Sequence, residues 1–462
     1  MMRHRKQGAV ACGAVSLLAF IGAAVASSAP AAATPAPNLY VAIGGNDSGN
    51  ACRLVAHPCA TVPYALTQAP SGADVNVGAG TFTLPVHITQ SVNIIGTVQS
   101  GSPATIFNPS TTVADTDSTY ENSSPQTMGV LVDITNGATA NLSNLVIKGN
   151  AASPSFDVTG CNDNFVGVYY HNASGTVTNV AIKGVELEQS LFGCQDGLGA
   201  YVATDTGSGT PSSVTFNGVT VKAYDKNGIT CNDAGTTCTV TDSKVTGIGP
   251  TALIAQNGIQ IAYNASGSVT GSTATANSYT AGGANNTATG ILIYDTGATT
   301  VSGNTLSAND VNLSAGSDSG GTSGSWSISG NTVTGATDNV TSGQPGYGEG
   351  NGYGDGIQLY VDGAVNPTTV SGNTTTGNYE YGIGIYGSSL MAVSTNTSNT
   401  NYDGIYVDSA SGSNTFTSNR AKKNLRYDYE DVSTGSGTSH TNDTWTTNTC
   451  KPLLDSAPTG LC

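Results

Sequence analysis

The chain has 462 residues, 60 of them glycine, with only 10% charged residues and a formal net charge of −16. An acidic chain repels nucleic acid and anionic membranes, so both are excluded as partners. The low charge is also typical of disordered segments, but apolar residues alternate regularly along this chain, and that alternation argues for folded β structure.

Residues 1–33 have the features of a secretory signal peptide. Arg3, Arg5 and Lys6 form a basic start, an apolar run covers residues 9–26, and three alanines at 31–33 match a small-residue cleavage site. A retained membrane anchor is the alternative. We therefore expect a secreted, extracellular monomer that has no membrane contact after cleavage.

The chain after the signal holds eight of the nine cysteines, and an even number predicts disulfides in a secreted protein. Eight cysteines allow on the order of 100 connectivities. Their spacing favours Cys52 with Cys59, Cys161 with Cys194, Cys231 with Cys238, and Cys450 with Cys462. No Cys/His spacing resembles a zinc site.

Residues 38–97 form an N-terminal module that caps the following coils. Thr61 is placed to cap a short helix with Pro63 in its first turn, and this helix would cover the open end of a coil. The segments YV, GND, PCATV, VNVGAGTF and VNIIG resemble the N-terminal start of the pectate-lyase-like superfamily of right-handed β-helix proteins. The resemblance implies a fold rather than an activity.

Residues 98–424 repeat one short pattern. Each copy has a Gly, alternating apolar residues, a turn and a second short strand; Gly356, Gly382 and Gly404 open three copies spaced 26 and 22 residues apart. No helix pattern lies between the strands, so each strand pairs with its counterpart in the next coil. The prediction is an all-β, right-handed single-stranded parallel β-helix with a short N-terminal capping helix. A column of stacked asparagines is expected at Asn304, Asn331, Asn373, Asn396 and Asn419.

Residues 425–462 are expected to form a C-terminal cap held by a disulfide, with Trp445 as an apolar plug. A charge cluster precedes and enters this cap, and we interpret it as a solvated ion-pair network. Its members are Arg420, Lys422, Lys423, Arg426, Asp428, Glu430 and Asp431.

Three lysines, Lys148, Lys183 and Lys222, occupy the same place in neighbouring coils and predict an outward column with about 5 Å between members. Such a column would suit uronates or sulfates; the alternative is a solvated face neutralised by nearby carboxylates. Polysaccharide lyases of the resembled fold use calcium bound by Asp or Glu and a Lys or Arg base, which makes Lys183 the candidate base. Candidate neighbours of Lys183 are Asp163, His171, Glu186, Glu188 and Asp196, and no lyase signature is matched residue by residue.

A second candidate site is acidic. Asp355, Tyr381 and Asp403 each precede the Gly that opens a strand, so they should form one column. The two carboxylates would lie two coils, or about 9.6 Å, apart, close to the separation in inverting glycosidases. The alternative is a simple Asx-Gly turn, because Asn227 and Asn257 hold the same place in other coils.

A third candidate is the Gly-rich loop at residues 343–356. Its Tyr347 and Tyr353 would stack on sugar rings, with a mobile loop as the alternative. Together these features predict a secreted protein that binds an extracellular polysaccharide, and they leave open whether it also cleaves the polymer. If it is an enzyme, a polysaccharide lyase that uses calcium is favoured over a glycoside hydrolase. The alternative is a non-catalytic cell-surface or matrix β-helix protein.

Overall fold

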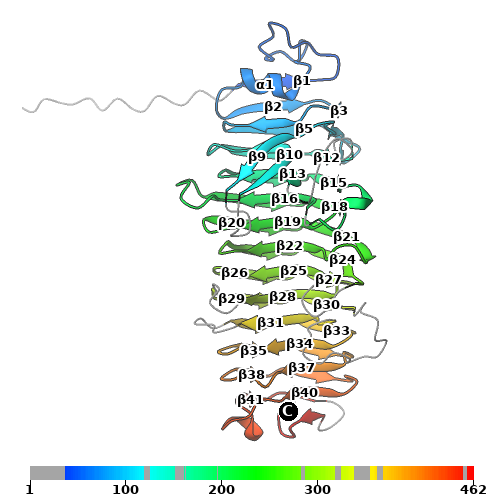
Figure 1. The fold of residues 1–462 in the computed structure, drawn as a ribbon, viewed down its shortest axis with the longest axis vertical. Helices are drawn as coiled ribbons and strands as arrows, with labels where there is room; N and C mark the ends of the chain where they lie inside the picture. The colour runs from blue at the N-terminus through cyan, green and yellow to red at the C-terminus, as the bar shows by residue number, and fades with distance from the viewer. Residues whose placement is uncertain are drawn as a thin grey trace, which may run out of the picture. The chain divides into compact units, whose positions relative to one another are not determined.

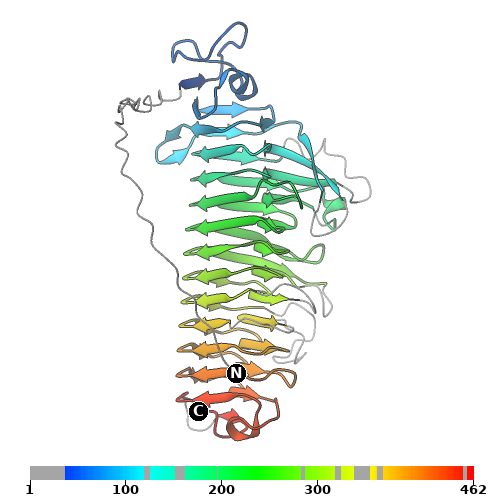
Figure 2. The same ribbon diagram turned by 90° about the vertical axis from the view of Figure 1, so that its left-hand side faces the viewer.

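The computed structural model describes residues 37–118, 125–150, 161, 163–194, 196–281, 287–317, 324–337, 354–361, 368–450 and 455–462. The signal-like residues 1–33 lie outside these ranges. Successive strands of the described part lie in three long sheets and pair in parallel with the equivalent strand one coil later (Figures 1 and 2). The predicted right-handed parallel β-helix is confirmed. Within the described residues no helix has the length and hydropathy to span a membrane.

Each coil contributes one strand to each sheet, and a coil runs from sheet II through sheet I to sheet III. Sheet I contains β1 (Asn38–Val41), β2 (Ala73–Val77), β5 (Val92–Gly96), β11 (Thr139–Ser143), β14 (Ser174–Thr178), β17 (Ser212–Asn217), β20 (Thr236–Thr241), β23 (Ser266–Thr270), β26 (Thr299–Ser302), β29 (Trp326–Ser329), β32 (Thr369–Ser371), β35 (Ala392–Ser394), β38 (Thr415–Thr417) and β41 (Thr444–Thr446).

Sheet II faces the viewer in Figure 1. It contains β4 (Val86–Ile88), β10 (Gln126–Ile134), β13 (Asp163–His171), β16 (Leu198–Ala203), β19 (Asn227–Asn232), β22 (Asn257–Ala262), β25 (Thr289–Tyr294), β28 (Val311–Ser317), β31 (Ile357–Val361), β34 (Tyr381–Tyr386), β37 (Asp403–Val407), β40 (Tyr427–Asp431) and β42 (Ser456–Ala457). A further strand, β9 (Val113–Asp117), pairs with β10 in antiparallel direction.

Sheet III closes each coil. It contains β3 (Gly80–Phe82), β8 (Thr105–Phe107), β12 (Leu145–Lys148), β15 (Ala181–Val185), β18 (Thr220–Tyr224), β21 (Lys244–Thr251), β24 (Thr273–Tyr279), β27 (Thr305–Ser307), β30 (Thr332–Thr334), β33 (Thr374–Thr376), β36 (Thr397–Asn399) and β39 (Arg420–Lys422). The strands β6 (Val98–Gln99) and β7 (Ser102–Pro103) form a small hairpin, and the 3₁₀ turns η3 (Gln189–Leu191) and η4 (Thr438–His440) lie in connections.

The core fills the inside of the coil because alternate residues of every strand point inward. Ile259 and Ile261 on β22, for example, are fully buried in the same cluster as Ile291 and Ile293 on β25. The repeat pattern does not predict β28, because its sequence VNLSAGS lacks the Gly that the pattern requires.

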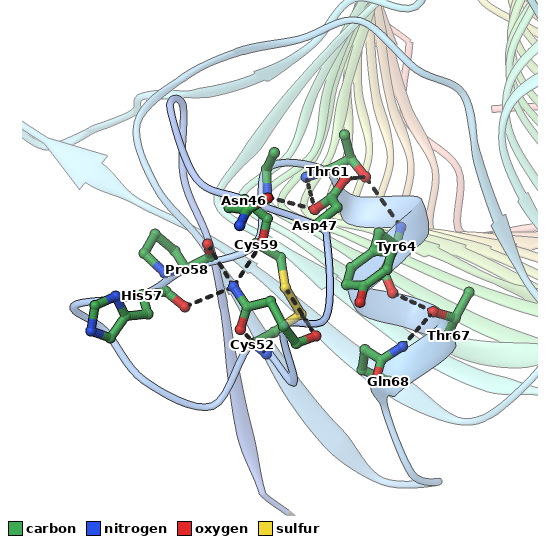
Figure 3. The surroundings of a disulfide bond; sticks show 12 residues. Asn46, Asp47, Cys52, His57, Pro58, Cys59, Thr61, Tyr64, Thr67 and Gln68 are labelled. Atoms are coloured by element: carbon green, nitrogen blue, oxygen red, sulfur yellow. Dashed lines mark hydrogen bonds between the residues drawn. A yellow bond between two sulfur atoms is a disulfide. The ribbon is translucent and has the colours of Figure 1, made fainter.

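The N-terminal cap contains the helix α1 (Val62–Gln68), whose first turn is capped by Thr61: its Oγ1 accepts a hydrogen bond from Tyr64 N at 3.2 Å (Figure 3). Asp47 fixes the cap by accepting from Ala60 N at 2.7 Å and from the Thr61 hydroxyl at 2.8 Å. The adjacent Cys52–Cys59 disulfide closes the preceding loop (Figure 3). The other three predicted pairs, Cys161–Cys194, Cys231–Cys238 and Cys450–Cys462, are also confirmed.

The predicted asparagine column is a buried hydrogen-bonded ladder between sheets I and III. Asn373 shows its repeating unit: its Oδ1 accepts from both the backbone N (3.0 Å) and Nδ2 (2.9 Å) of Asn331, while its Nδ2 donates to Asn396 Oδ1 (3.0 Å) and Ile328 O (3.0 Å). The ladder continues to Asn448, one coil beyond the prediction. Each amide inside the ladder, such as that of Asn373, therefore joins three coils.

We expect Asn373→Ala to lower the free energy of unfolding by about 2 kcal/mol, because it leaves buried donors of Asn331 and acceptors of Asn396 without partners. Urea denaturation of the purified variant measures the change. The matched control is Asn217→Ala, which removes an exposed amide from the end of β17. Equal effects of the two substitutions would contradict a structural role for the ladder.

Candidate functional site

The outer face of sheet II presents three columns of side chains in register. The first column holds the residue before each strand-opening position: Val130, Val166, Leu198, Asn227, Asn257, Thr289, Val311, Asp355, Tyr381, Asp403 and Tyr427. The second holds Asp133, Tyr169, Tyr201, Thr230, Gln260, Leu292, Ser314, Gln358, Gly384, Tyr406 and Glu430. The third holds His171, Ala203, Asn232, Ala262, Tyr294, Gly316, Tyr360 and Tyr386.

The acidic candidates Asp355 and Asp403 lie in the first of these columns, with Tyr381 between them. Asp355 is fully buried; its Oδ1 accepts from Tyr381 N at 3.2 Å and its Oδ2 accepts from the Tyr386 hydroxyl at 2.7 Å. The bond to Tyr381 N joins two coils, so this carboxyl does more than close an Asx turn within its own coil. It also contacts a half-buried tyrosine on the surface.

Asp403 is also fully buried but has a cationic partner. Its Oδ2 accepts from Arg426 Nε at 3.1 Å and Nη2 at 2.5 Å, and its Oδ1 accepts from Tyr427 N at 2.7 Å. Arg426 also pairs with Glu430 and lies over the Tyr402 ring, 4.9 Å from the centroid. The expectation of a solvated ion-pair network is therefore wrong for Arg426, because Arg426 forms an ion pair with Asp403, whose side chain is 0% exposed.

The two carboxyls have different electrostatic environments, and these favour different protonation states. Burial raises the pKa of Asp355 to about 7, against the lowering effect of the hydrogen bonds from Tyr386 and Tyr381. Burial also raises the pKa of Asp403, but the hydrogen bonds and charge of Arg426 oppose it. Near neutral pH Asp355 carries a proton for part of the time, whereas the Arg426 contact favours ionised Asp403.

The tyrosines around this pair divide into buried and accessible rings. Tyr381 is fully buried and stacks on Tyr406 with 4.3 Å between ring centroids, so its ring is not available to a sugar. Tyr386 is half-buried and in register with Tyr360 of the preceding coil. Its burial argues against the sugar contact that the sequence predicts at Tyr381, and Tyr347 and Tyr353 lie outside the described residues.

Tyr294, Tyr360 and Tyr386 form what we call the tyrosine strip, in the third column of sheet II. All three are half-buried. Gly316 occupies the position between Tyr294 and Tyr360, and a Cβ there would lie 2.2 Å from the Tyr360 ring. The glycine therefore lets the Tyr360 ring lie against the backbone of β28.

The lysine column lies on sheet III rather than on this face. Lys148 on β12, Lys183 on β15 and Lys222 on β18 are in direct register. Partial burial, then the charges of Lys148 and Lys222, lower the pKa of Lys183, which is the direction that a catalytic base requires. The register places Lys183 several coils before Asp355, so the two candidates belong to separate sites.

The acidic neighbours expected for Lys183 do not assemble around it as a ligand group. His171 lies on sheet II between Asp115 (2.7 Å) and Asp205 (2.9 Å), and Asp196 is buried at the corner before β16. Burial raises the pKa of Glu186. Among the side chains that the structure describes, which do not include that of Asp163, no group of three or more His, Cys, Asp or Glu is placed to hold a metal ion. The residues described here thus do not fit the calcium site of a lyase.

The His171 cluster was not predicted as a unit. Asp115 and Asp117 come from β9, which the sequence pattern does not reveal as a strand, and Asp117 Oδ2 accepts hydrogen bonds from the hydroxyls of Tyr169 (3.2 Å) and Tyr201 (2.8 Å). The Tyr169 ring stacks on both His171 and Tyr201. This cluster fastens β9 to the outer face of the first coils of sheet II.

Comparisons with known proteins agree with this architecture. A family model described as periplasmic copper-binding protein (NosD) matches residues 348–448. Among solved structures, the periplasmic alginate epimerase AlgG is 11% identical with a TM-score of 0.51, and the match covers 82% of this chain and 77% of that chain.

Two more distant structures are also similar. Pectate lyase Pel9A is 13% identical with a TM-score of 0.39 and coverage of 92% and 78%, and GH136 lacto-N-biosidase from Eubacterium ramulus is 12% identical with a TM-score of 0.49 and coverage of 90% and 67%. A search of curated proteins gives no match. The chain therefore has a right-handed parallel β-helix fold of the pectate-lyase-like type.

Proposed function

We propose that this protein binds a polysaccharide outside the cytoplasm, along the outer face of sheet II. The tyrosine strip carries the proposal: Tyr294, Tyr360 and Tyr386 are half-buried rings in one column of a rigid sheet. Aromatic rings with one accessible face stack on the apolar faces of sugars. With about 4.8 Å for each coil, Tyr386 lies one coil beyond Tyr360 and Tyr294 lies two coils before it, an arrangement along one axis that suits a linear polymer.

Two further observations support the proposal. The four disulfides fit an oxidising compartment, either extracellular or periplasmic. The alginate epimerase of similar fold is periplasmic and is named for a polysaccharide substrate. We propose a secreted monomer that has no membrane contact, in line with the expectation from residues 1–33.

We expect Tyr360→Ala to weaken polysaccharide binding about tenfold, because it removes the central ring of the tyrosine strip. Affinity electrophoresis against a panel of neutral, acidic and sulfated polysaccharides measures the change. The matched control is Tyr40→Ala, which removes a half-buried tyrosine from β1 of sheet I. Lack of binding to the whole panel would overturn the proposal.

A second function, hydrolysis of the bound polysaccharide, is favoured by the contrast between Asp355 and Asp403. Both carboxyls are fully buried, so this role requires the Tyr386 hydroxyl to leave Asp355 when the polymer binds. Asp355, with a pKa of about 7, would then protonate the glycosidic oxygen, and Asp403, held by Arg426, would take a proton from the attacking water. Their two-coil spacing of about 9.6 Å is close to that of inverting glycosidases. New reducing ends in the panel would support hydrolysis.

The product assay also separates the alternatives. Unsaturated uronides that absorb ultraviolet light, formed with calcium and lost in Lys183→Ala, would instead place a lyase at the lysine column, with Lys148 and Lys222 as contacts for the acidic groups. Binding without any product, with or without calcium, would favour a non-catalytic cell-surface or matrix protein.

A further inference from the structure

The middle of sheet II lies between the His171 cluster and the pair of Asp355 and Asp403. It carries a group of uncharged polar side chains that have no role in the proposed function. On β19, β22, β25 and β28, none of the three outward columns contains a charged residue. We call the polar residues of the first three of these strands the amide strip. Its members are Asn227, Thr230, Asn232, Asn257, Gln260 and Thr289.

Gln260 organises the amide strip. Its Oε1 accepts from Asn227 Nδ2 at 3.1 Å and Asn257 Nδ2 at 3.2 Å, and its Nε2 donates to Asn232 Oδ1 at 3.0 Å. Asn257 Oδ1 in turn accepts from the Thr289 hydroxyl at 2.7 Å. These bonds between coils fix the orientation of each amide.

Three atoms of the amide strip have no hydrogen-bond partner although they are buried: Asn227 Oδ1, Thr230 Oγ1 and Asn232 Nδ2. The three residues are 1%, 1% and 0% exposed. Buried polar atoms are nearly always paired in folded proteins, so three neighbouring exceptions on one strand call for a bound water or a ligand. They offer an acceptor, a hydroxyl that both donates and accepts, and a donor.

The accessible side of this site lies at β25. Leu292 and Tyr294 are half-buried there, and so is Tyr263, which directly follows β22. The rings of Tyr263 and Tyr294 meet edge to face, with 5.7 Å between centroids. The amide strip is therefore continuous with the tyrosine strip. Because its atoms are buried, an extended ligand contacts both strips only when side chains on the accessible side move aside.

The charges around the amide strip disfavour an anionic ligand. Lys226, the residue before Asn227, directs its Nζ to Ala255 O at 3.0 Å. Carboxyl groups lie beyond both ends of the strip on the same face, at Asp133 and Asp355. A buried uronate or sulfate would thus meet no cation in the three columns where they cross β19, β22, β25 and β28, at a large desolvation cost.

We propose that the amide strip binds an uncharged, hydroxyl-rich sugar segment, and hence that the polysaccharide ligand is neutral in this part. This inference rests on the proposed polysaccharide binding and names the class of ligand. Sugar hydroxyls both donate and accept hydrogen bonds, which matches the three unpartnered atoms. It replaces the uronate or sulfate that the lysine column led us to expect from the sequence.

The test uses the full secreted chain and affinity electrophoresis in gels that contain a galactan, a mannan, a xylan or a β-glucan, each compared with polygalacturonate, alginate and a sulfated galactan. We expect retardation by at least one neutral polymer. Retardation by acidic polymers alone would overturn the neutral-ligand inference but leave the proposed function standing. No retardation by any polymer would overturn both.

Thr230→Val locates the site. It removes the unpartnered hydroxyl without changing the side-chain shape, so we expect about tenfold weaker binding of the neutral polymer and a melting temperature that is unchanged or higher. Thr230→Ser keeps the hydroxyl and should restore binding. Thr239→Val, at a half-buried position on β20 of sheet I, is the matched control. Wild-type binding by Thr230→Val, or a lower melting temperature with unchanged binding, would overturn the assignment.

Discussion

Replacing Asp403 with asparagine is expected to lower the free energy of unfolding by about 1 to 3 kcal/mol, because it removes the buried carboxylate that accepts hydrogen bonds from Arg426, although Arg426 is 23% exposed and keeps Glu430. Asp403 is fully buried and takes two hydrogen bonds from Arg426 on the same oxygen. Urea denaturation at pH 8 measures the loss.

The same substitution at Asp355, two coils away in the same column, should not lower the free energy of unfolding. Burial raises the pKa of Asp355 to about 7, so at pH 8 the folded protein holds a buried ionised carboxyl with no cationic partner in its hydrogen bonds. An asparagine keeps an acceptor for Tyr381 N and removes the charge. We expect Asp355→Asn to leave the free energy of unfolding at pH 8 unchanged or higher.

A double-mutant cycle tests the ion pair directly. Asp403→Asn combined with Arg426→Met should lose less stability than the sum of the single changes, because neither partner is then left as an uncompensated charge. Additive losses would contradict the ion pair as the source of the effect.

Activity separates the catalytic role from the structural one. If the pair hydrolyses a polysaccharide, Asp355→Asn should abolish release of reducing ends while the polymer still binds and the protein remains as stable as the wild type. Asp355→Asn that retains release would remove Asp355 from the reaction and leave the binding proposal intact.

Much of the fold could be predicted from the sequence because the coil repeats its own local chemistry. An asparagine at a fixed corner, such as Asn396, and the alternation around Ile383 and Ile385 can be read within one coil. The same residues then pair with their counterparts in the next coil, so each local pattern predicts the whole stack. β28 escaped prediction because Asn312 stands where the neighbouring coils have Gly290 and Gly356. A second ladder through Asn378 and Asn401 also escaped, although Asn378 follows Gly377 just as Asn373 follows Gly372.

The candidate site was less predictable because its geometry depends on neighbouring coils. The sequence placed Asp355, Tyr381 and Asp403 in one column, yet it gave no sign that Arg426 would reach back to Asp403. The amide strip was hidden for a related reason: Thr230 looks like an ordinary outward strand residue, and only its burial without a partner makes it unusual. Burial by residues far away in the sequence cannot be predicted from a local pattern.

Raising the pH from 6.5 to above 9 is expected to destabilise the protein by about 3 kcal/mol through His171 alone. Burial by itself would lower the pKa of His171, but the hydrogen bond and charge of Asp115, followed by the charges of Asp205 and Asp117, raise this pKa to about 9. The folded state therefore binds this proton more tightly than the unfolded state. Its contribution is fully present below the unfolded pKa of about 6.5 and is lost as the pH rises through 9.

Other groups act in the same direction at lower pH. Burial and the charge of Asp115 raise the pKa of Asp133 to about 6, although His87 and His171 oppose them, and burial raises the pKa of Asp225 to about 8. Each such group favours folding when protonated, so stability should fall between mildly acidic and alkaline pH. The protein should accordingly be most stable at mildly acidic pH.

His171→Gln isolates the histidine within this general trend. The variant keeps a donor for one carboxylate but has no charge, so it should be less stable than the wild type at pH 6, and the difference should shrink as the pH approaches 9. Urea denaturation at a series of pH values measures both proteins, and His57→Gln, which changes an exposed histidine in the N-terminal loop, is the matched control. A difference between His171→Gln and wild type that stays constant with pH would show that the ring packs against Tyr169 without contributing its charge. A shrinking difference would instead show that β9 is held to sheet II by a protonated histidine between the carboxylates of Asp115 and Asp205.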